Sequence, residues 1–461
     1  MATTSFTNLI TLTDASWFND ADKAAYGYLT GVAGTNTITA TGPASLSAYA
    51  AGNKFHFVPA ATNTGATTIN ITQSGASALG AKNVFFNGAA CVGGEIKIGV
   101  PCMIIYDGTQ FQISGSDGLI WTNYAREPIN TNPNFLVDQI NEGGLYTASA
   151  GTVPGPDGWS GSATGAGVFK MRTLADPDNA ALKCMEITCT TADAAIAATD
   201  VYQVYTAIEG NDVRALKVGT ASAEKITVQF KFKSSVTGVY GLSVINNASN
   251  RCYVGTITVP DTAENAYSLT LTLDTSGTWE YTTSAGIYLR LCLAAGPDHQ
   301  GTALAWAANN IMTTSAQCNF MSSNTNIAYL KRFHVVPSGC VLSYANTDIE
   351  KELAKCMRYY EKSYSQGVAL GTASRLGGIS TIYNAAIAGA PGFSFRVPKR
   401  ITPTITGYSS LTGASGKWYD TTATDQNVTF NNTGIAGVEN VSLAAGTSAY
   451  LGHYAATARL S

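Results

Sequence analysis

The stretch VQFKFK, residues 228–233, sets the fold class of this 461-residue chain. Its apolar residues alternate with polar ones, so Val228, Phe230 and Phe232 share one face of an extended strand. The same period of two recurs in SLTLTL, residues 268–273, and in IYLRLCL, residues 287–293. This pattern predicts strands that have one buried face and one wet face.

Turn-forming residues separate these strands at intervals of roughly 8 to 12 residues, a spacing that is common in all-β sandwiches. Half-buried strands joined by short turns are typical of antiparallel sheets. We therefore predict a jelly-roll β-sandwich over residues 134–336, a length that suits such a domain.

A smaller all-β module is predicted over residues 35–116. Gly and Asn cut its sequence into short strands, which favours tight turns between them. The strongest hairpin signal is the Asp107-Gly108 pair, which separates the apolar stretches PCMIIY and QFQI.

The remaining segments complete a modular chain. Residues 1–34 are too few to bury a core alone, and residues 117–133 are predicted to be an extended, proline-containing linker. Residues 337–366 form a junction, and residues 367–461 return to Gly-rich β-type sequence. The predicted fold class is mainly β: antiparallel modules with one amphipathic helix before a C-terminal β-domain.

Composition and charge disfavour several classes of partner. The formal net charge is -3, and no basic run exceeds the Lys399-Arg400 pair, whereas nucleic-acid binding needs a clustered positive face. We find no apolar run of about 18 residues and no basic leader before an apolar one, so we predict neither membrane insertion nor a secretion signal. Nine dispersed cysteines without a CxxC pair favour a reducing cytoplasm.

The stretch TDIEKELAKCMRYYEKSY, residues 347–364, is predicted to be a helix. Thr347 is the expected N-cap, and the charged residues, Glu352 included, are expected to face solvent. The expected assembly face is an apolar stripe of residues three or four apart: Ile349, Leu353, Met357, Tyr360 and Tyr364. Because the inward positions are apolar, we predict a packing element that holds the C-terminal β-domain rather than an active-site helix.

Several segments resemble, in the expected order, parts of tail fibre and receptor-binding proteins of tailed bacteriophages. LTDASWFNDADKAAY (12–26) resembles a short virion-attachment segment, and AGNKFHFVPAATNTGATTINI (51–71) with GEIKIGVPCMIIYDGTQFQI (94–113) resembles a small β-module of such fibres. KVGTASAEKITVQFKFKSSVTG (217–238) and YLKRFHVVPSG (329–339) resemble a jelly-roll domain of phage tail proteins. ELAKCMRYYEKSY (352–364), FRVPKRITPTIT (395–406) and ATARL (456–460) resemble the C-terminal domain that often follows it.

The resemblance implies a homotrimer on the virion tail, made in the host cytoplasm. Residues 1–34, with Trp17, Phe18 and Tyr26, would attach it to the tail or to an adaptor protein. The distal domains would recognise a host glycan or an outer-membrane protein, and no cofactor is implied.

Signatures of catalysis are missing from the sequence. We find no GxSxG elbow, P-loop, HExxH motif or dinucleotide fingerprint. We therefore predict a binding protein and not an enzyme. Two alternatives stay open: a glycan-degrading tail spike, which needs two carboxyls about 5 to 10 Å apart, and a structural tail or capsid decoration without a receptor.

Sugar binding uses flat apolar side chains together with amides and carboxylates. The C-terminal domain offers these candidates: Tyr408, Trp418, Tyr419, Asp420, Asp425, His453 and Tyr454. The alternative is that they fill a core or a trimer interface. Asp176 and Asp178 offer oxygen ligands that suit Ca²⁺, although a solvated turn is the alternative and we predict no metal.

Overall fold

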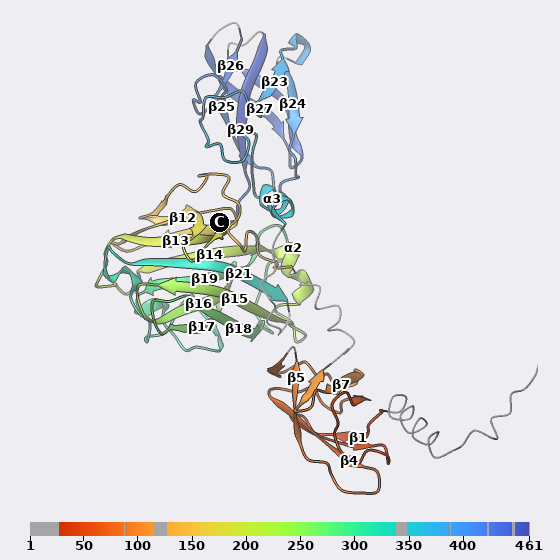
Figure 1. Cartoon of the computed structure of the whole chain (residues 1–461). Helices are drawn as coiled ribbons and strands as arrows, with labels where there is room; N and C mark the ends of the chain where they lie inside the picture. The colour runs from red at the N-terminus through yellow and green to blue at the C-terminus, as the bar shows by residue number, and fades with distance from the viewer. Residues whose placement is uncertain are drawn as a thin grey trace, which may run out of the picture. The chain divides into compact units, whose positions relative to one another are not determined.

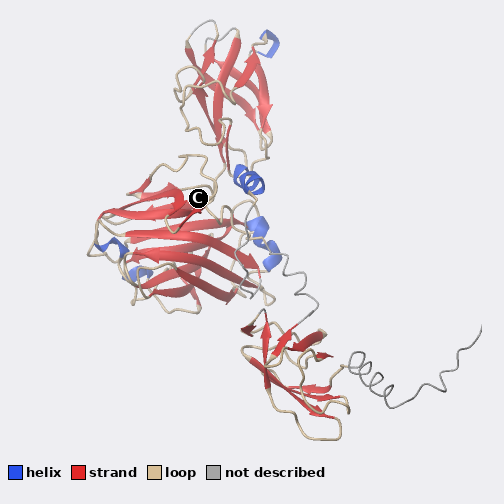
Figure 2. Ribbon diagram, in the orientation of Figure 1, coloured by secondary structure: helices blue, strands red, loops and turns tan. Residues whose placement is uncertain are grey.

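The computed structural model describes residues 27–86, 88–113, 127–337, 348–387, 389–421, 424–444 and 448–460. Trp17, Phe18, Tyr26 and Thr347 lie outside these ranges. The chain divides into two compact units, Met1–Arg126 and Glu127–Ser461. Strands make up nearly all of the described secondary structure (Figure 2), so the prediction of a mainly β fold is confirmed.

The first unit is built on one sheet around one core. Its order is β1-β2-β4-β5-β8-β7-β3, with β6 beside β5. The strands are β1 (Thr30–Ala33), β2 (Thr37–Gly42), β3 (Lys54–Phe57), β4 (Thr67–Gln73), β5 (Lys82–Phe86), β6 (Ala89–Ala90), β7 (Cys102–Tyr106) and β8 (Phe111–Ile113). The predicted hairpin is confirmed, since β7 pairs antiparallel with β8 and Gly108 takes a φ of 108° in the turn.

The second unit contains an antiparallel β-sandwich (Figure 1), as predicted. The seven-stranded sheet has the order β10-β11-β14-β19-β16-β17-β20. Its strands are β10 (Gly151–Pro154), β11 (Trp159–Ala163), β14 (Val201–Glu209), β16 (Gly238–Asn246), β17 (Arg251–Val259), β19 (Ala285–Ala295) and β20 (Trp306–Ala308).

The six-stranded sheet has the order β18-β15-β21-β13-β12-β9. Its strands are β9 (Tyr146–Ala148), β12 (Val168–Asp176), β13 (Asn179–Thr191), β15 (Lys225–Ser234), β18 (Asn265–Thr272) and β21 (Ile327–Pro337). Val228, Phe230 and Phe232 are fully buried in the core between the two sheets, as their alternation predicts.

Strand β19 departs from the predicted pattern, because both of its faces are buried. Residues 309–317, which follow β20 and which we call the strap, cover the outer face of the seven-stranded sheet. A Cβ added to Gly241 of β16 would lie 2.7 Å from Thr313 Cβ, and Ile311 packs against Tyr288 of β19 and its neighbours. The expected wet face is therefore wrong for β19, although it holds for β18.

A third sheet in the second unit follows the sandwich in sequence, and we call it the C-terminal sheet. Its order is β22-β29-β26-β27-β28-β24, with β23 and β25 also paired to β29. The strands are β22 (Tyr360–Lys362), β23 (Ile379–Ile382), β24 (Ala390–Ser394), β25 (Thr404–Ser409), β26 (Lys417–Asp420), β27 (Asp425–Thr433), β28 (Gly437–Leu443) and β29 (Ala449–Thr457).

The predicted helix is present but shorter, as α3 (Ile349–Met357). Asp348 caps it by accepting a hydrogen bond from the Glu350 backbone N–H. Tyr360 begins strand β22, so Tyr360 and Tyr364 are not on the helix although both are buried. The predicted stripe is also wrong at its start, because Ile349 is 50% exposed.

The buried face of α3 carries Glu352, Cys356 and Met357 instead. Glu352 was expected to face solvent, but it is 1% exposed and accepts a hydrogen bond from the Asn132 backbone N–H. A buried N–H needs an acceptor, which accounts for the inward carboxylate. Asn130 and Asn132 are themselves buried, so this part of the predicted linker packs into the second unit.

The other described helices are short. They are α2 (Gly210–Val213) and four 3₁₀ turns, η1 (Arg214–Leu216), η2 (Pro297–His299), η3 (Phe320–Ser322) and η4 (Ala385–Ile387). Among the described residues, no helix has the length and apolar character needed to cross a membrane. All eight cysteines in the described ranges are free thiols.

Candidate functional site

The candidate ligand-binding residues of the C-terminal sheet are mostly core residues. Four of the seven are almost or fully inaccessible: Trp418 (0% exposed), Asp420 (0%), His453 (0%) and Tyr454 (3%). The predicted exposed loop around Trp418 is strand β26, whose alternate residues point inward. These four side chains therefore cannot contact a glycan in this arrangement.

Hydrogen bonds inside the core hold these groups. Trp418 Nε1 donates to the His453 carbonyl at 2.7 Å, and Tyr454 OH donates to Glu361 Oε1 at 2.6 Å. The His453 ring stacks on Tyr364, with ring centroids 3.7 Å apart. Glycines mark the site in the sequence, since a Cβ at Gly452 would lie 2.2 Å from the Trp418 ring.

The other three candidates are half-buried. Tyr419 lies opposite Asp425 where β26 pairs with β27, whereas Tyr408 lies opposite His453 where β25 pairs with β29. The strand pairing thus brings Tyr419 and Asp425 together. Asp425 already accepts hydrogen bonds from the hydroxyls of Ser409 and Thr412.

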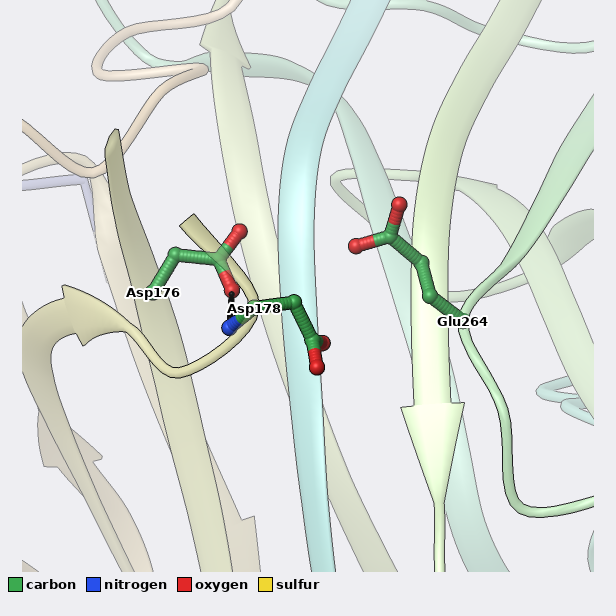
Figure 3. A group of neighbouring side chains, drawn as sticks. All are labelled: Asp176, Asp178 and Glu264. Atoms are coloured by element: carbon green, nitrogen blue, oxygen red, sulfur yellow. Dashed lines mark hydrogen bonds between the residues drawn. The ribbon is translucent and has the colours of Figure 1, made fainter. Parts of the chain in front are cut away.

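A group of charged side chains lies on the outer face of the six-stranded sheet. Asp176 ends β12, Asp178 follows in the turn to β13, and Glu264 precedes β18. The turn is fixed locally, because Asp176 Oδ1 accepts a hydrogen bond from the Asp178 N–H at 2.9 Å. Figure 3 shows the three carboxyl side chains reaching toward one another from opposite sides of a strand.

Lys331 of β21 joins these carboxylates. Its Nζ lies 2.5 Å from Asp176 Oδ1 and 2.7 Å from both Asp178 Oδ2 and Glu264 Oε2. The lysine is 1% exposed, and its three N–H donors match three acceptors. A β-bulge at this point, with Arg332 at a φ of 50°, re-aims the strand next to the carboxylates.

The charges shift one another's protonation equilibria. Hydrogen bonds from Lys233 and Lys331 lower the pKa of Asp178 to about 2. Burial opposes the charged form of Lys331, but the bonds to three carboxylates outweigh it and raise the pKa of the ammonium. Asp178 and Lys331 are therefore charged at neutral pH.

The carboxylate group was a candidate site for Ca²⁺, through Asp176 and Asp178. The carboxylate oxygens of Asp176, Asp178 and Glu264 do lie within 4.8 Å of one another. However, the Lys331 ammonium binds all three and takes the position of a cation. A calcium ion would have to displace a buried, fully hydrogen-bonded lysine, so we assign no metal to these residues.

A pocket opens beside this group, and we call it the charged pocket. Its volume is about 280 Å³. The lining residues are Asp176, Asp178, Asn179, Leu182, Lys183, Lys231, Glu264, Lys331 and Arg332. Asn179 and Lys183 are exposed at its rim, so their polar groups are available to a ligand.

Glu264 and Lys331 were not among the sequence-based candidates. The signal that points to them is YLKRF, residues 329–333, where two adjacent cations interrupt an otherwise alternating strand. Such an interruption indicates a bulge. The partners of the lysine come from a turn and a loop far apart in sequence, which no local pattern predicts.

Comparisons with known proteins give no sequence family: no family model and no curated protein matches the chain. Among solved structures, CBM4 is similar over 45% of this chain and 99% of its own, with 14% identity and a TM-score of 0.24. The family 11 carbohydrate-binding module of Clostridium thermocellum, in complex with a mixed-linked tetrasaccharide, is similar over 43% and 98%, with 11% identity and a TM-score of 0.22.

The enzymatically active domain of bacteriophage CBA120 tailspike protein 4 is similar over 50% of this chain and 22% of its own, with 10% identity and a TM-score of 0.22. The structural similarity is thus to carbohydrate-binding modules and to a phage tailspike domain, and it is distant. At these scores the likenesses carry no argument about function, which rests on the residues themselves.

Proposed function

We propose that this chain is a tail fibre protein of a tailed bacteriophage that binds a host cell-surface glycan without cleaving it. In this proposal residues 1–34 attach a homotrimer to the virion tail or to an adaptor, and the later domains meet the host. The ordered resemblance of the sequence segments to tail fibre modules supports the assignment to a tail.

The charged pocket is the observation that carries the binding function. A sugar presents many hydroxyl groups that both donate and accept hydrogen bonds, so it needs acceptors and donors placed together. The pocket supplies carboxylate oxygens and the Lys231 ammonium, which its ion pair with Glu264 holds in place, and charged partners make the stronger hydrogen bonds. Leu182 and the lysine methylenes offer apolar contact to the ring.

Weak binding at each pocket suffices for attachment. Three linked copies convert later contacts into intramolecular ones and raise the effective concentration. A fibre of this kind therefore holds a glycan-coated surface although no single site binds tightly.

Competition with virions for host cells tests the proposal. We expect purified protein to block adsorption and Lys183→Ala to weaken the block by roughly 10- to 100-fold, the loss of one charged hydrogen bond. Lys183 is exposed and forms no ion pair among the described residues, so the variant keeps the fold. Lys225→Ala, at the exposed start of β15, is the matched control and should compete like the wild type.

Two outcomes would contradict the proposal. Wild-type protein that fails to compete would remove receptor binding and favour a structural decoration. Release of reducing ends from host capsule or lipopolysaccharide would replace simple binding with a glycan-degrading spike.

A further inference from the structure

Arg290 of β19 lies at the centre of the outer face of the seven-stranded sheet. The registers place Tyr205 of β14 directly opposite it on one side and Ser243 of β16 on the other. Side chains opposite one another in antiparallel strands are about 5 Å apart at Cβ, so these three form one row across the sheet.

The guanidinium of Arg290 is buried without an anion. The residue is 6% exposed, and Nη1 donates to Asn310 Oδ1 of the strap at 2.6 Å. In the described part of the chain Arg290 has no ion pair with a carboxylate. Burial lowers its pKa to about 10, so it still carries its charge at neutral pH. A buried charge without a partner is costly to a fold.

Polar groups around Arg290 also lack partners. Ser243 Oγ, Thr313 Oγ1 and Gln203 Oε1 are buried, and none has a hydrogen-bond partner among the residues described. The exposures of these residues are 0%, 0% and 8%. Gln203 lies opposite Cys292, and Thr313 lies over Gly241, which is also opposite Cys292. They therefore belong to the row next to Arg290.

We propose that Arg290, Ser243 and Thr313 form a binding site for a carboxylate group on this face of the sheet. A guanidinium matches a carboxylate in a planar, bidentate geometry, and each hydroxyl supplies one more donor. The rings of Tyr205 and Tyr288, with centroids 5.8 Å apart, add apolar surface beside the guanidinium. The strap covers this face and supplies Asn310 and Thr313.

Two sources of carboxylate fit this chemistry. One is an acidic sugar of the host glycan, an assignment that rests on the proposed function. The other is a small free carboxylate anion. The two sources differ in whether the sugar ring contributes to binding. Glucuronate carries a ring and a carboxylate, acetate carries only the carboxylate and glucose only the ring, so these three probes distinguish the two sources.

Thermal unfolding with these three probes tests the site. We expect millimolar glucuronate to raise the melting temperature by at least about 2 °C and glucose to leave it unchanged. An equal shift with acetate assigns the site to free carboxylates, and a shift with glucuronate alone assigns it to acidic sugars. No shift with either carboxylate overturns the site. If such a protein still competes with virions, the proposed function stands without it.

Arg290→Met separates a ligand site from a structural arginine. Removing an uncompensated buried charge should raise the melting temperature of the ligand-free protein, by about 3 °C, and abolish the glucuronate shift. Two results together would show that Arg290 serves only the fold. They are a lower melting temperature for Arg290→Met and a glucuronate shift in Ser243→Ala that equals that of the wild type. Arg172→Met is the control, since Arg172 pairs with Glu186 on the other sheet and should leave the glucuronate shift intact.

Discussion

Lys331 determines the stability of the charged pocket. Its ammonium neutralises Asp176 and Glu264, which are otherwise buried or half-buried carboxylates. Removing Lys331 leaves the buried Asp176 without its counter-charge, although Glu264 keeps Lys231 and Asp178 keeps Lys233. We expect Lys331→Met to lower the free energy of unfolding at pH 7 by about 3 kcal/mol, measured by urea denaturation. Lys217→Met, which breaks an ion pair with exposed Glu224, should cost less than about 1 kcal/mol.

The dependence of the free energy of unfolding on pH in the acid range gives a second test of the Lys331 network. The pKa of Asp178 in the folded protein is about 2, below the value of about 3.9 that an unfolded aspartate has. Its contribution to stability is therefore present above pH 4 and lost as the pH falls through about 2. Lys331→Met removes one of the two cations that lower this pKa, so the loss between pH 4 and pH 2 should become shallower. An equally steep loss in the variant would contradict the network.

The sequence predicted which side chains of a strand point into the core, but it did not predict the contacts of the polar side chains on the other face. Val228, Phe230 and Phe232 are buried because a period of two is a local property of the strand. Arg290 and Lys331 occupy polar positions whose burial depends on the strap and on a distant turn. The aromatic residue Trp418 was assigned to a binding loop, but its indole fits against Gly407 and Gly452, which only the strand pairing brings together.

Helix α3 was predicted as an element, but its contacts were not. Its apolar spacing indicated a packing helix before the C-terminal β-domain, and such a helix is present. Its buried face is offset, because Glu352 bonds to Asn132 and Arg358 bonds to Glu209 of the sandwich rather than to solvent. Charge pairs within the helix were expected, and the structure forms them across elements instead.

The pair formed by Arg358 and Glu209 holds α3 to the end of β14. Arg358 Nε and Nη2 donate to the two carboxylate oxygens of Glu209 at 2.8 and 2.7 Å, and Tyr359 OH donates at 3.0 Å. Glu209 is 1% exposed, whereas the arginine side chain is 36% exposed. We expect Arg358→Met to cost about 2 kcal/mol, less than the roughly 3 to 5 kcal/mol of a fully buried pair, because the arginine is partly exposed.

Differential scanning calorimetry checks this joint. The wild-type second unit should unfold in one transition, and Arg358→Met should shift the C-terminal sheet to an earlier, separate transition. Lys351→Met is the matched control, because Lys351 pairs with exposed Glu127 and the variant should leave a single transition. A single unshifted transition in Arg358→Met would mean that other contacts, such as Arg400 to the Thr283 carbonyl, hold the joint alone.

For the chain as a whole, the mainly β class followed from composition and alternation, whereas the assembly did not. Turn residues and period-two strands are distributed over the full length, so the β class could be predicted from local sequence. The number of chains that associate depends on surfaces that a single chain leaves uncovered. The predicted homotrimer therefore needs its own test.

Exposed apolar side chains near β23 supply that test. Leu376 is 77% exposed and Ile382 is 72% exposed, both in or next to a strand of the C-terminal sheet. Apolar side chains left exposed on one domain favour contact between chains. We expect light scattering to give a mass of about 144 kDa, three times the 48.1 kDa of one chain. Ile382→Ser should lower this mass, whereas Leu304→Ser, which changes a 67% exposed residue of the sandwich, should not. A wild-type protein of 48.1 kDa at micromolar concentration would contradict the trimer and, with it, the multivalent attachment that weak glycan binding requires.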